Sequence, residues 1–250
     1  VMNTPPIAPV VLVTGAARRV GAEIARHLHA AGARVALHYR RSAADAEALA
    51  AGFNAQRPGS ALVLQGDLLD MAVLPGMVSS VVARFGRLDG LVNNASSFFP
   101  TAMGEIDEGA WSDLIGSNLK APLFLSQAAA PHLMASGGAI INIVDIHAER
   151  PLKGYPLYSA AKAGLLGLTR AMALELAPKV RVNGVAPGAI EWPDDGQFPP
   201  AEREAIVRHT LLGRTGAPSD IARTVLFLLF DAPYITGQVI AVDGGRSVNL

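Results

Sequence analysis

The feature that most constrains the fold is a chain-long alternation of short apolar segments with alanine-rich helical patterns. Helical patterns cover residues 20–31, 42–54 and 159–177, among others. The apolar segments lack the polar alternation of a half-exposed strand, as strands of a parallel sheet covered on both faces do. Seven such segments occur, at residues 10–14, 34–38, 61–65, 88–92, 139–144, 180–185 and 238–242. We therefore predict an α/β fold with one doubly wound parallel sheet of about seven strands and helices on both faces.

The composition narrows the class of protein. Half of the 250 residues are hydrophobic, which suffices for one large core, so we predict a single domain over residues 1–250. Basic and acidic residues number 21 each, so we expect neither nucleic-acid binding nor attachment to a membrane. The chain has no cysteine, which excludes disulfides, thiolate catalysis and cysteine-based metal sites.

We expect no targeting segment, membrane span or metal site. Residues 1–9 lack the positive region and long apolar stretch of a signal peptide. The apolar run 225–230 is far shorter than the roughly 20 residues that cross a bilayer. We therefore expect a cytoplasmic protein. Five histidines have no metal-ligand spacing and are interpreted as structural or solvated: His27, His29, His132, His147 and His209.

A turn with two glycines, residues 14–21, follows the first apolar segment and opens a helical one. Its sequence is Thr-Gly-Ala-Ala-Arg-Arg-Val-Gly. Gly15 and Gly21 let the backbone approach a pyrophosphate, while the helix N-terminus supplies free N–H groups and partial positive charge. Arg19 stands where the common dinucleotide fingerprint has its middle glycine. The pattern indicates a phosphate-binding turn, with an ordinary glycine-capped turn as the alternative.

The end of the second apolar segment bears on the choice of cofactor. An enzyme for NAD places Asp or Glu there, to accept hydrogen bonds from the ribose hydroxyls. This chain instead has His38, Tyr39, Arg40, Arg41 and Ser42. Two guanidinium groups and a hydroxyl can bind a 2′-phosphate, which a carboxylate would repel. The sequence therefore favours NADPH over NADH, unless these residues form only a solvated basic tip.

Three residues suggest proton-transfer chemistry. Tyr158 and Lys162 are four residues apart in a helical pattern, so their side chains share one face, and Asp145 precedes them. A cation beside the phenol would stabilise the phenolate, so we predict a lowered pKa for Tyr158. This spacing is common in helices, so the pair alone does not identify a site.

Taken together, the motifs resemble those of the short-chain dehydrogenase/reductase family over nearly the whole chain. They are residues 14–21, the Asn-Asn-Ala of 93–95, Asn118, Tyr158 with Lys162, and Pro187 with Gly188. The resemblance implies a Rossmann-type subunit, usually in a homotetramer, that moves hydride between a nicotinamide and a small-molecule substrate. The C-terminal residues 242–250 are a candidate contact to a neighbouring subunit.

The resemblance also implies residue roles. Lys162 would hold the nicotinamide ribose while acidifying Tyr158, and Asn118 would support a water-linked proton path. The implied cofactor contacts further include Arg19 and Val20 in the turn, Asp67 and Leu68 beside the adenine, Asn94 and Ala95, and Pro187 and Gly188 on the nicotinamide side.

Aspartate at position 145, where most members have serine, resembles the pteridine reductase branch. The likeness extends to Arg19, residues 38–42 and residues 94–100. It implies a pterin sandwiched between the nicotinamide and the ring of Phe98, with Ser96 and Arg19 bonding the pterin edge and the cofactor phosphate. The alternative for Phe98 and its neighbour Phe99 is a core or lid pair of aromatic residues.

The resulting hypothesis is NADPH-dependent reduction of a 7,8-dihydropterin, such as dihydrobiopterin, dihydromonapterin or dihydrofolate, to the tetrahydropterin. Asp145 and Tyr158 would protonate the ring nitrogen. The loop 190–200 is expected to fold over the substrate, with Trp192 as either a lid or an anchor of that loop, while Ile190 stands where a polar residue often holds the pterin. One alternative is a carbonyl reductase for 3-oxoacyl chains or sugar ketones; another is a non-catalytic NADPH sensor.

Overall fold

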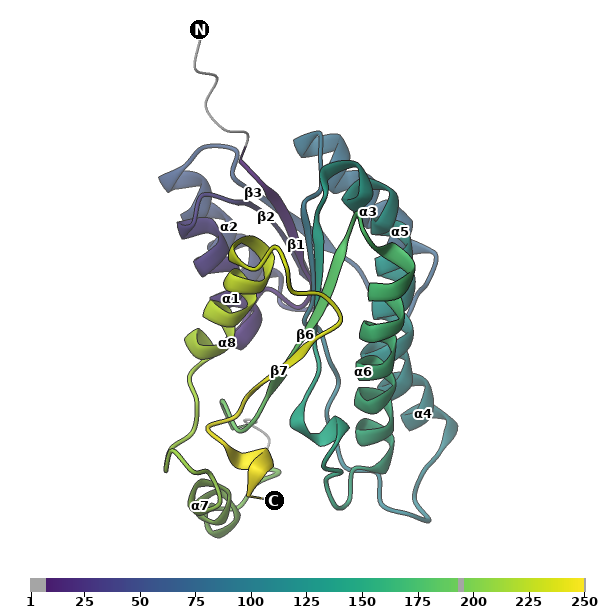
Figure 1. Cartoon of the computed structure of the whole chain (residues 1–250), viewed down its shortest axis with the longest axis vertical. Helices are drawn as coiled ribbons and strands as arrows, with labels where there is room; N and C mark the ends of the chain where they lie inside the picture. Colours follow the sequence, from purple (N-terminus) through teal and green to yellow (C-terminus); the bar gives the residue numbers. More distant parts are fainter. Residues whose placement is uncertain (1–7, 193–195, 250) are drawn as a thin grey trace, which may run out of the picture.

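The computed structural model describes residues 8–192 and 196–249, and its strands form one parallel sheet (Figure 1). The order is β3-β2-β1-β4-β5-β6-β7, with every neighbouring pair parallel. The predicted doubly wound sheet is therefore confirmed. The strands are β1 (Val10–Val13), β2 (Arg34–Tyr39), β3 (Ala61–Gln65), β4 (Gly90–Asn93), β5 (Ala139–Ile143), β6 (Arg181–Pro187) and β7 (Val239–Val242).

Helices cover both faces of the sheet, with α1, α2 and α8 on one side and α3, α5 and α6 on the other (Figure 1). The α-helices are α1 (Arg19–Ala30), α2 (Ala43–Gln56), α3 (Val73–Phe85), α4 (Glu108–Ile115), α5 (Ala121–Ser136), α6 (Pro156–Leu176), α7 (Pro200–Arg208) and α8 (Pro218–Leu226). Short helical turns are η1 (Gly116–Lys120), η2 (Ile146–Ala148), η3 (Phe227–Asp231) and η4 (Arg246–Val248). None of the described helices is long and apolar enough to cross a membrane.

Two hydrophobic cores, one on each face, explain why the strands read as continuous apolar runs. In β1, Val11 and Val13 belong to the core beneath α1 and α8. Val10 and Leu12 point the other way, into the core beneath α3 and α5. All four side chains are fully buried, so no position on this strand can be polar.

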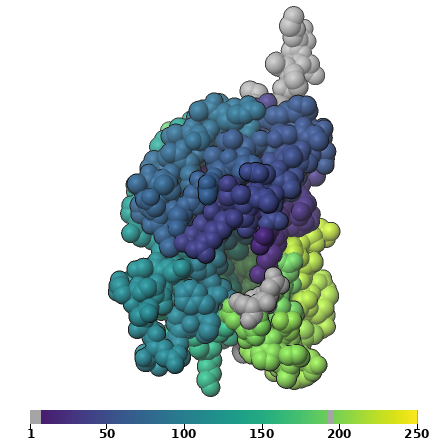
Figure 2. Space-filling view, turned by 180° about the vertical axis from the view of Figure 1, so that it is seen from behind, coloured from purple at the N-terminus to yellow at the C-terminus, as the bar shows by residue number. Residues whose placement is uncertain are grey.

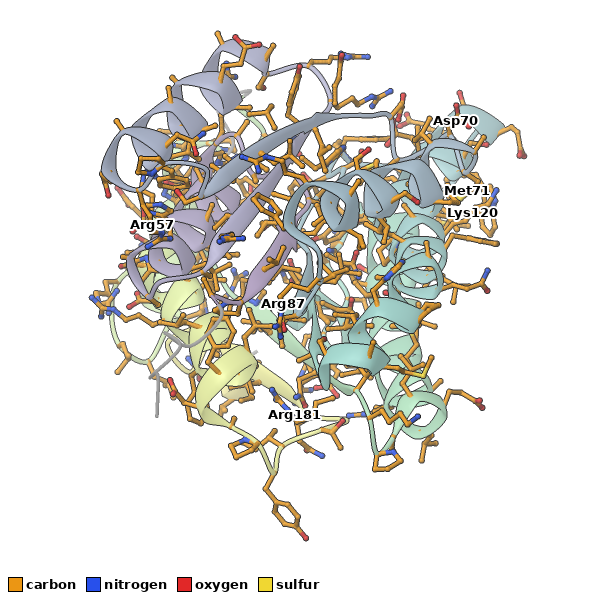
Figure 3. The ribbon with its side chains drawn as sticks, turned by 90° about the horizontal axis from the view of Figure 1, so that it is seen from above. Arg57, Asp70, Met71, Arg87, Lys120 and Arg181 are labelled. Atoms are coloured by element: carbon orange, nitrogen blue, oxygen red, sulfur yellow. The ribbon has the colours of Figure 1, made fainter. Side chains whose placement is uncertain are left out.

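Arginine side chains form hydrogen bonds at the end of the sheet where the strands begin. This end faces the viewer in Figure 3. Arg181 donates to the carbonyl oxygens of Leu228 and Leu229 at 2.6 and 2.8 Å, which ties β6 to η3. Arg87 binds Asp89 through two hydrogen bonds of 2.8 and 2.6 Å. These contacts lie at the end of the sheet remote from α7 and η4, which cluster where the strands finish (Figure 1).

Candidate active site

A cavity of about 540 Å³ opens at the carboxyl ends of the strands. It lies where the strand order reverses, since β1 pairs with β2 on one side and with β4 on the other. Open α/β sheets bind ligands at such a switch point. Figure 2 views the molecule from behind relative to Figure 1. It shows a hollow bordered by purple residues near the start of the chain and by green residues after 196.

The turn between β1 and α1 forms one wall of this cavity, and it requires glycine at two positions. Gly15 has a φ of +62°, and a Cβ added to it would lie 3.0 Å from the Cα of Ala95. An added Cβ on Gly21 would lie 2.1 Å from the carbonyl oxygen of Gly15. Arg19, which occupies the middle glycine's place, has a φ of +51°, a conformation that is strained for a residue with a side chain. The turn therefore fits the close backbone approach of a pyrophosphate.

Side chains from neighbouring strands brace the turn. The amide of Asn94 donates to the carbonyl oxygens of Thr14 and Gly15, at 2.9 and 3.2 Å. His38 Nδ1 accepts from the Gly15 N–H at 3.2 Å, and His38 Nε2 lies 3.0 Å from the Gly66 carbonyl oxygen. Burial lowers the pKa of His38, which matches a neutral ring that accepts at Nδ1 and donates at Nε2. His38 thus positions the turn as well as lining the cavity.

The basic residues expected near the ribose divide into two groups. Arg40 lines the cavity and forms an ion pair with Asp67 at 2.8 Å. Three predicted cofactor residues lie outside the lining: Tyr39 is buried at the end of β2, Arg41 is exposed, and Ser42 precedes α2. Arg18, which the sequence analysis passed over, lines the cavity and pairs with Asp45 at 2.5 Å. Its place beside Arg19 in the turn was the available signal.

Tyr158 and Asp145 meet at the floor of the cavity. The Tyr158 hydroxyl donates to Asp145 Oδ2 at 2.7 Å, while Asp145 Oδ1 accepts from the His147 N–H at 2.8 Å. Asp145 lies two residues after the end of β5 and caps η2, which fixes its carboxylate. Pro156 begins α6, because its locked φ suits the first helical turn, and Tyr158 lies in that same turn, two residues later.

The prediction that Tyr158 has a lowered pKa is wrong for this structure. Burial, followed by the charge and hydrogen bond of Asp145, raises the pKa of Tyr158 well above its ordinary value of 10.0. The Lys162 ammonium lies 5.6 Å from the centre of the Tyr158 ring and donates to the Ile143 carbonyl oxygen at 2.9 Å. Burial lowers the pKa of Lys162 to about 8, although Asp145 opposes the shift. A desolvated phenol beside a carboxylate keeps its proton.

Asn118 lies in η1, a π-helical turn between α4 and α5. Its amide nitrogen donates to the carbonyl oxygens of Ser97 and Leu114 at 2.9 and 3.0 Å. Its Oδ1 is buried and has no hydrogen-bond partner among the residues described. An acceptor of this kind suits the water-linked role implied by the family, although Asn118 is not itself part of the cavity lining.

Aromatic rings form the wall opposite the glycine turn. Phe98 stacks on Tyr155 with ring centres 4.7 Å apart and meets Tyr158 edge-on at 4.7 Å. Phe198 lies parallel to Phe98 at 6.1 Å, and Trp192 lies 5.7 Å from Phe198. Phe98 lines the cavity, and so do Trp192 and Phe198 of the loop 190–200. The remainder of that loop, residues 193–195, falls outside the described residues.

Arg19 links the glycine turn to this loop. Its guanidinium forms an ion pair with Glu191 at 3.2 Å and donates to the carbonyl oxygens of Glu191 and Trp192 at 3.0 and 3.3 Å. The buried Ile190 also borders the cavity.

The cavity therefore brings together most residues predicted for the site. Those in its lining are Gly15, Arg19, Val20, Gly21, His38, Arg40, Asp67, Leu68, Asn94, Ala95, Ser96, Phe98, Asp145, Tyr158, Lys162, Pro187 and Gly188. One lining residue that the sequence analysis missed is Arg246, from the C-terminal segment. Nothing in the pattern around it indicated that its side chain turns back into the cavity of its own chain. The described residues contain no group of acidic and histidine side chains placed to hold a metal ion.

A doubly wound sheet, a glycine turn at the switch point and a buried Tyr-Lys pair define a nicotinamide-dependent oxidoreductase. Comparison with known families agrees: residues 15–247 match the family described as enoyl-(acyl carrier protein) reductase. The chain belongs to the short-chain dehydrogenase/reductase family.

Individual relatives differ in their named substrates. The chain is 42% identical to pteridine reductase 1 of Leishmania tarentolae, over 99% of both chains. It is 38% identical to a 3-oxoacyl-[acyl-carrier-protein] reductase of Staphylococcus aureus, over 94% of this chain and 96% of the relative. It is also 36% identical to a (2S)-[(R)-hydroxy(phenyl)methyl]succinyl-CoA dehydrogenase subunit of Thauera aromatica, over 96% of both. The family is thus shown, while its members act on different classes of substrate.

Proposed function

We propose that this chain is an NADPH-dependent reductase of pterins, which converts a 7,8-dihydropterin to the tetrahydropterin. The observation that carries the proposal is the 2.7 Å hydrogen bond from the Tyr158 hydroxyl to the Asp145 carboxylate. A neutral hydroxyl at position 145 could polarise a ketone, whereas an anion would oppose the negative charge that develops on a carbonyl oxygen. A carboxylate coupled to a tyrosine suits delivery of a proton to a ring nitrogen.

The residues that would hold the cofactor fit a phosphorylated dinucleotide. The backbone of the glycine turn would receive the pyrophosphate, and Gly21 leaves no room there for a side chain. Arg40 and Arg18 line the neighbouring part of the cavity, and their guanidinium groups suit a 2′-phosphate. Each already has a carboxylate partner, which holds the guanidinium in place.

When bound, NADPH supplies the hydride that adds to the imine carbon of the dihydropterin. The chain's own residues supply the proton for the adjacent nitrogen. Tyr158 holds its proton at neutral pH, and its hydroxyl donates a hydrogen bond to Asp145. Lys162 would bind the nicotinamide ribose, and the buried Oδ1 of Asn118 would receive a water that connects the site to solvent.

The aromatic wall supports binding of a flat heterocycle. Phe98 is held by its stack on Tyr155, so its ring would meet a ligand without reorganising. Stacking on such a ring contributes about 1 kcal/mol beyond the burial itself. Ser96, which borders the same space, offers a hydroxyl to the polar edge of the ring. The name of the Leishmania relative agrees with this substrate class.

The proposal is tested by NADPH oxidation with a dihydropterin and with a β-ketoacyl thioester as substrates. We expect the wild type to reduce the pterin, and Asp145→Ser to lower that turnover about 100-fold while NADPH affinity is kept. Asp145→Asn, which keeps the shape but not the charge, should behave like Asp145→Ser. Asp231→Asn changes an exposed carboxylate and serves as control.

The carbonyl reductase alternative has its own support in the Staphylococcus relative. Rapid turnover of the thioester with no turnover of any pterin would favour that alternative and end the pterin proposal. Full pterin turnover by Asp145→Ser would remove the assigned role of Asp145.

A homotetramer is the assembly we propose. Large apolar side chains are exposed on neighbouring helices, with Trp111 of α4 at 49% and Phe124 of α5 at 38%. Exposed apolar side chains of this size are enriched where subunits meet. Light scattering on the purified protein tests the assembly, and a monomeric mass would contradict it.

A further inference from the structure

Arg246 is a buried guanidinium that faces the cavity without a protein partner. The residue is 7% exposed, and its Nε is buried without a hydrogen bond. No hydrogen bond or ion pair within 4.0 Å joins this side chain to any described residue. Arg246 belongs to the lining of the cavity. A buried charge without a partner is costly, so its retention requires a reason.

The carboxylates whose charges act on Arg246 form no ion pair with it, and two of them are engaged by other donors. Asp243 accepts from the N–H groups of Gly245 and Ser247, at 2.9 and 2.7 Å. Asp145 accepts from Tyr158 and from a backbone N–H, so neither of its oxygens is without a donor. Burial lowers the pKa of Arg246, and the charges of Asp145, Asp243 and Glu202 only oppose that shift from a distance. The fold thus keeps the guanidinium available.

The cations of the cavity differ in whether they have an ion-pair partner. The arginines that line the other end each pair with a carboxylate. Lys162 and Arg246 are buried and have no carboxylate within 4.0 Å among the described residues, although the charge of the half-buried Asp145 raises the pKa of both. Arg246 also interacts with Asp243 and Glu202, but only from a distance. A ligand that brings a carboxylate would give this guanidinium a direct partner.

We infer that Arg246 binds a carboxylate carried by the substrate, beside the ring that is reduced. This deepens the proposed function: the preferred substrates are pterins with an acidic substituent rather than a neutral one. A guanidinium presents a planar pair of N–H donors, which matches the two oxygens of a carboxylate. The buried Ile206 of α7 lines the same cavity, and its apolar surface shields such a pair from water.

The test compares two dihydropterins, one with an anionic and one with a neutral substituent at C6. The wild type and Arg246→Met are assayed with 7,8-dihydropterin-6-carboxylate and with 6-hydroxymethyl-7,8-dihydropterin. A charge-assisted pair in a desolvated site predicts an increase in KM of about 10- to 100-fold for the carboxylate. The KM of the neutral pterin should change less than about threefold. Arg246→Lys keeps the charge but not the planar pair, and should recover part of the affinity.

A binding measurement separates this inference from the proposed function. Fluorescent pterin-6-carboxylate is titrated into the NADP⁺-loaded wild type and into loaded Arg246→Met. If the variant loses affinity while the wild type turns over no pterin, the Arg246 inference stands and the proposed reaction fails. The inference is overturned if both proteins bind the probe equally or the wild type does not bind it. It is overturned as well if Arg246→Met weakens NADP⁺ binding as much as probe binding, since Arg246 would then be a cofactor residue.

The melting temperature distinguishes ligand binding from a merely structural role for Arg246. If Arg246 binds the ligand, replacing its buried, unpaired charge by methionine should leave the melting temperature unchanged or raise it. A lowered melting temperature with equal loss of both substrates would show that Arg246 supports the fold instead of binding the ligand.

Discussion

The buried ammonium of Lys162 should make the stability of this protein increase with pH in a predictable range. The pKa of Lys162 is about 8 in the folded chain, against an ordinary 10.5. Below pH 8, Lys162 is protonated in both the folded and the unfolded state, so the full difference between its two pKa values counts against folding. At about 1.4 kcal/mol per pKa unit, this burial costs about 3 kcal/mol of unfolding free energy. The cost falls as pH rises from 8 towards 10.5, because the folded state loses the proton first.

The perturbation is Lys162→Met, which keeps an unbranched chain and removes the charge. The variant loses the 2.9 Å hydrogen bond to the Ile143 carbonyl oxygen, which costs about 1 kcal/mol. At pH 7 we therefore expect it to be more stable than the wild type by about 2 kcal/mol, although catalytically inactive. By pH 9.5 this difference should shrink by about 2 kcal/mol, since about 1.5 pKa units of the wild-type cost have then been relieved.

Urea unfolding at pH 7 and pH 9.5, at equal ionic strength and protein concentration, measures this change. Other groups titrate equally in both proteins, so the difference between them isolates Lys162. Lys179→Met changes an exposed lysine and should show no such dependence on pH. If the difference between Lys162→Met and wild type is the same at both pH values, the argument from burial is refuted.

Four other substitutions test separate parts of the structure. Gly21→Ala places a Cβ 2.1 Å from the Gly15 carbonyl oxygen, so fluorescence titration should show about tenfold weaker nucleotide binding. Gly52→Ala, whose Cβ meets no atom within 4 Å, should instead bind normally and gain about 1 kcal/mol of stability in urea. Arg40→Ala should raise the KM for NADPH about tenfold and leave that for NADH unchanged in steady-state assays; equal effects on both cofactors would contradict a 2′-phosphate contact. Arg181→Met leaves its three carbonyl acceptors without this donor, so urea unfolding should show a loss of about 3 kcal/mol.

The sheet was predictable because strands buried on both faces must consist of apolar residues. The starts of helices were harder to predict. The apolar spacing indicated a helix only from residue 159, whereas α6 begins at Pro156, where proline's fixed φ and not apolar spacing favours the first turn. The π-helical turn η1 left no mark in the sequence, because it depends on an extra residue accommodated between α4 and α5.

The site was predictable where residue type limits the chemistry. The meeting of Asp145 and Tyr158 followed from motif order and is present at 2.7 Å. The position of the Lys162 ammonium did not follow, because spacing on a helix fixes the base of a long side chain and not the partner of its tip. That tip binds the carbonyl oxygen at the end of β5. Arg246 was missed because only the folded chain brings the C-terminal segment beside the cavity.

The pKa shifts of Tyr158 and Lys162 bear on which substrates the site favours. Burial raises the pKa of the tyrosine and lowers that of the lysine, so both are driven towards their neutral forms. A tyrosine in this state, donating to Asp145, is a weak acid for a developing alkoxide, and the adjacent carboxylate weakens it further. A ring nitrogen is a better proton acceptor than a carbonyl oxygen and gains from a carboxylate that passes the proton on. We therefore propose that the aspartate favours substrates whose reduction ends in an N–H bond, which is the physical basis for preferring a pterin over a ketone.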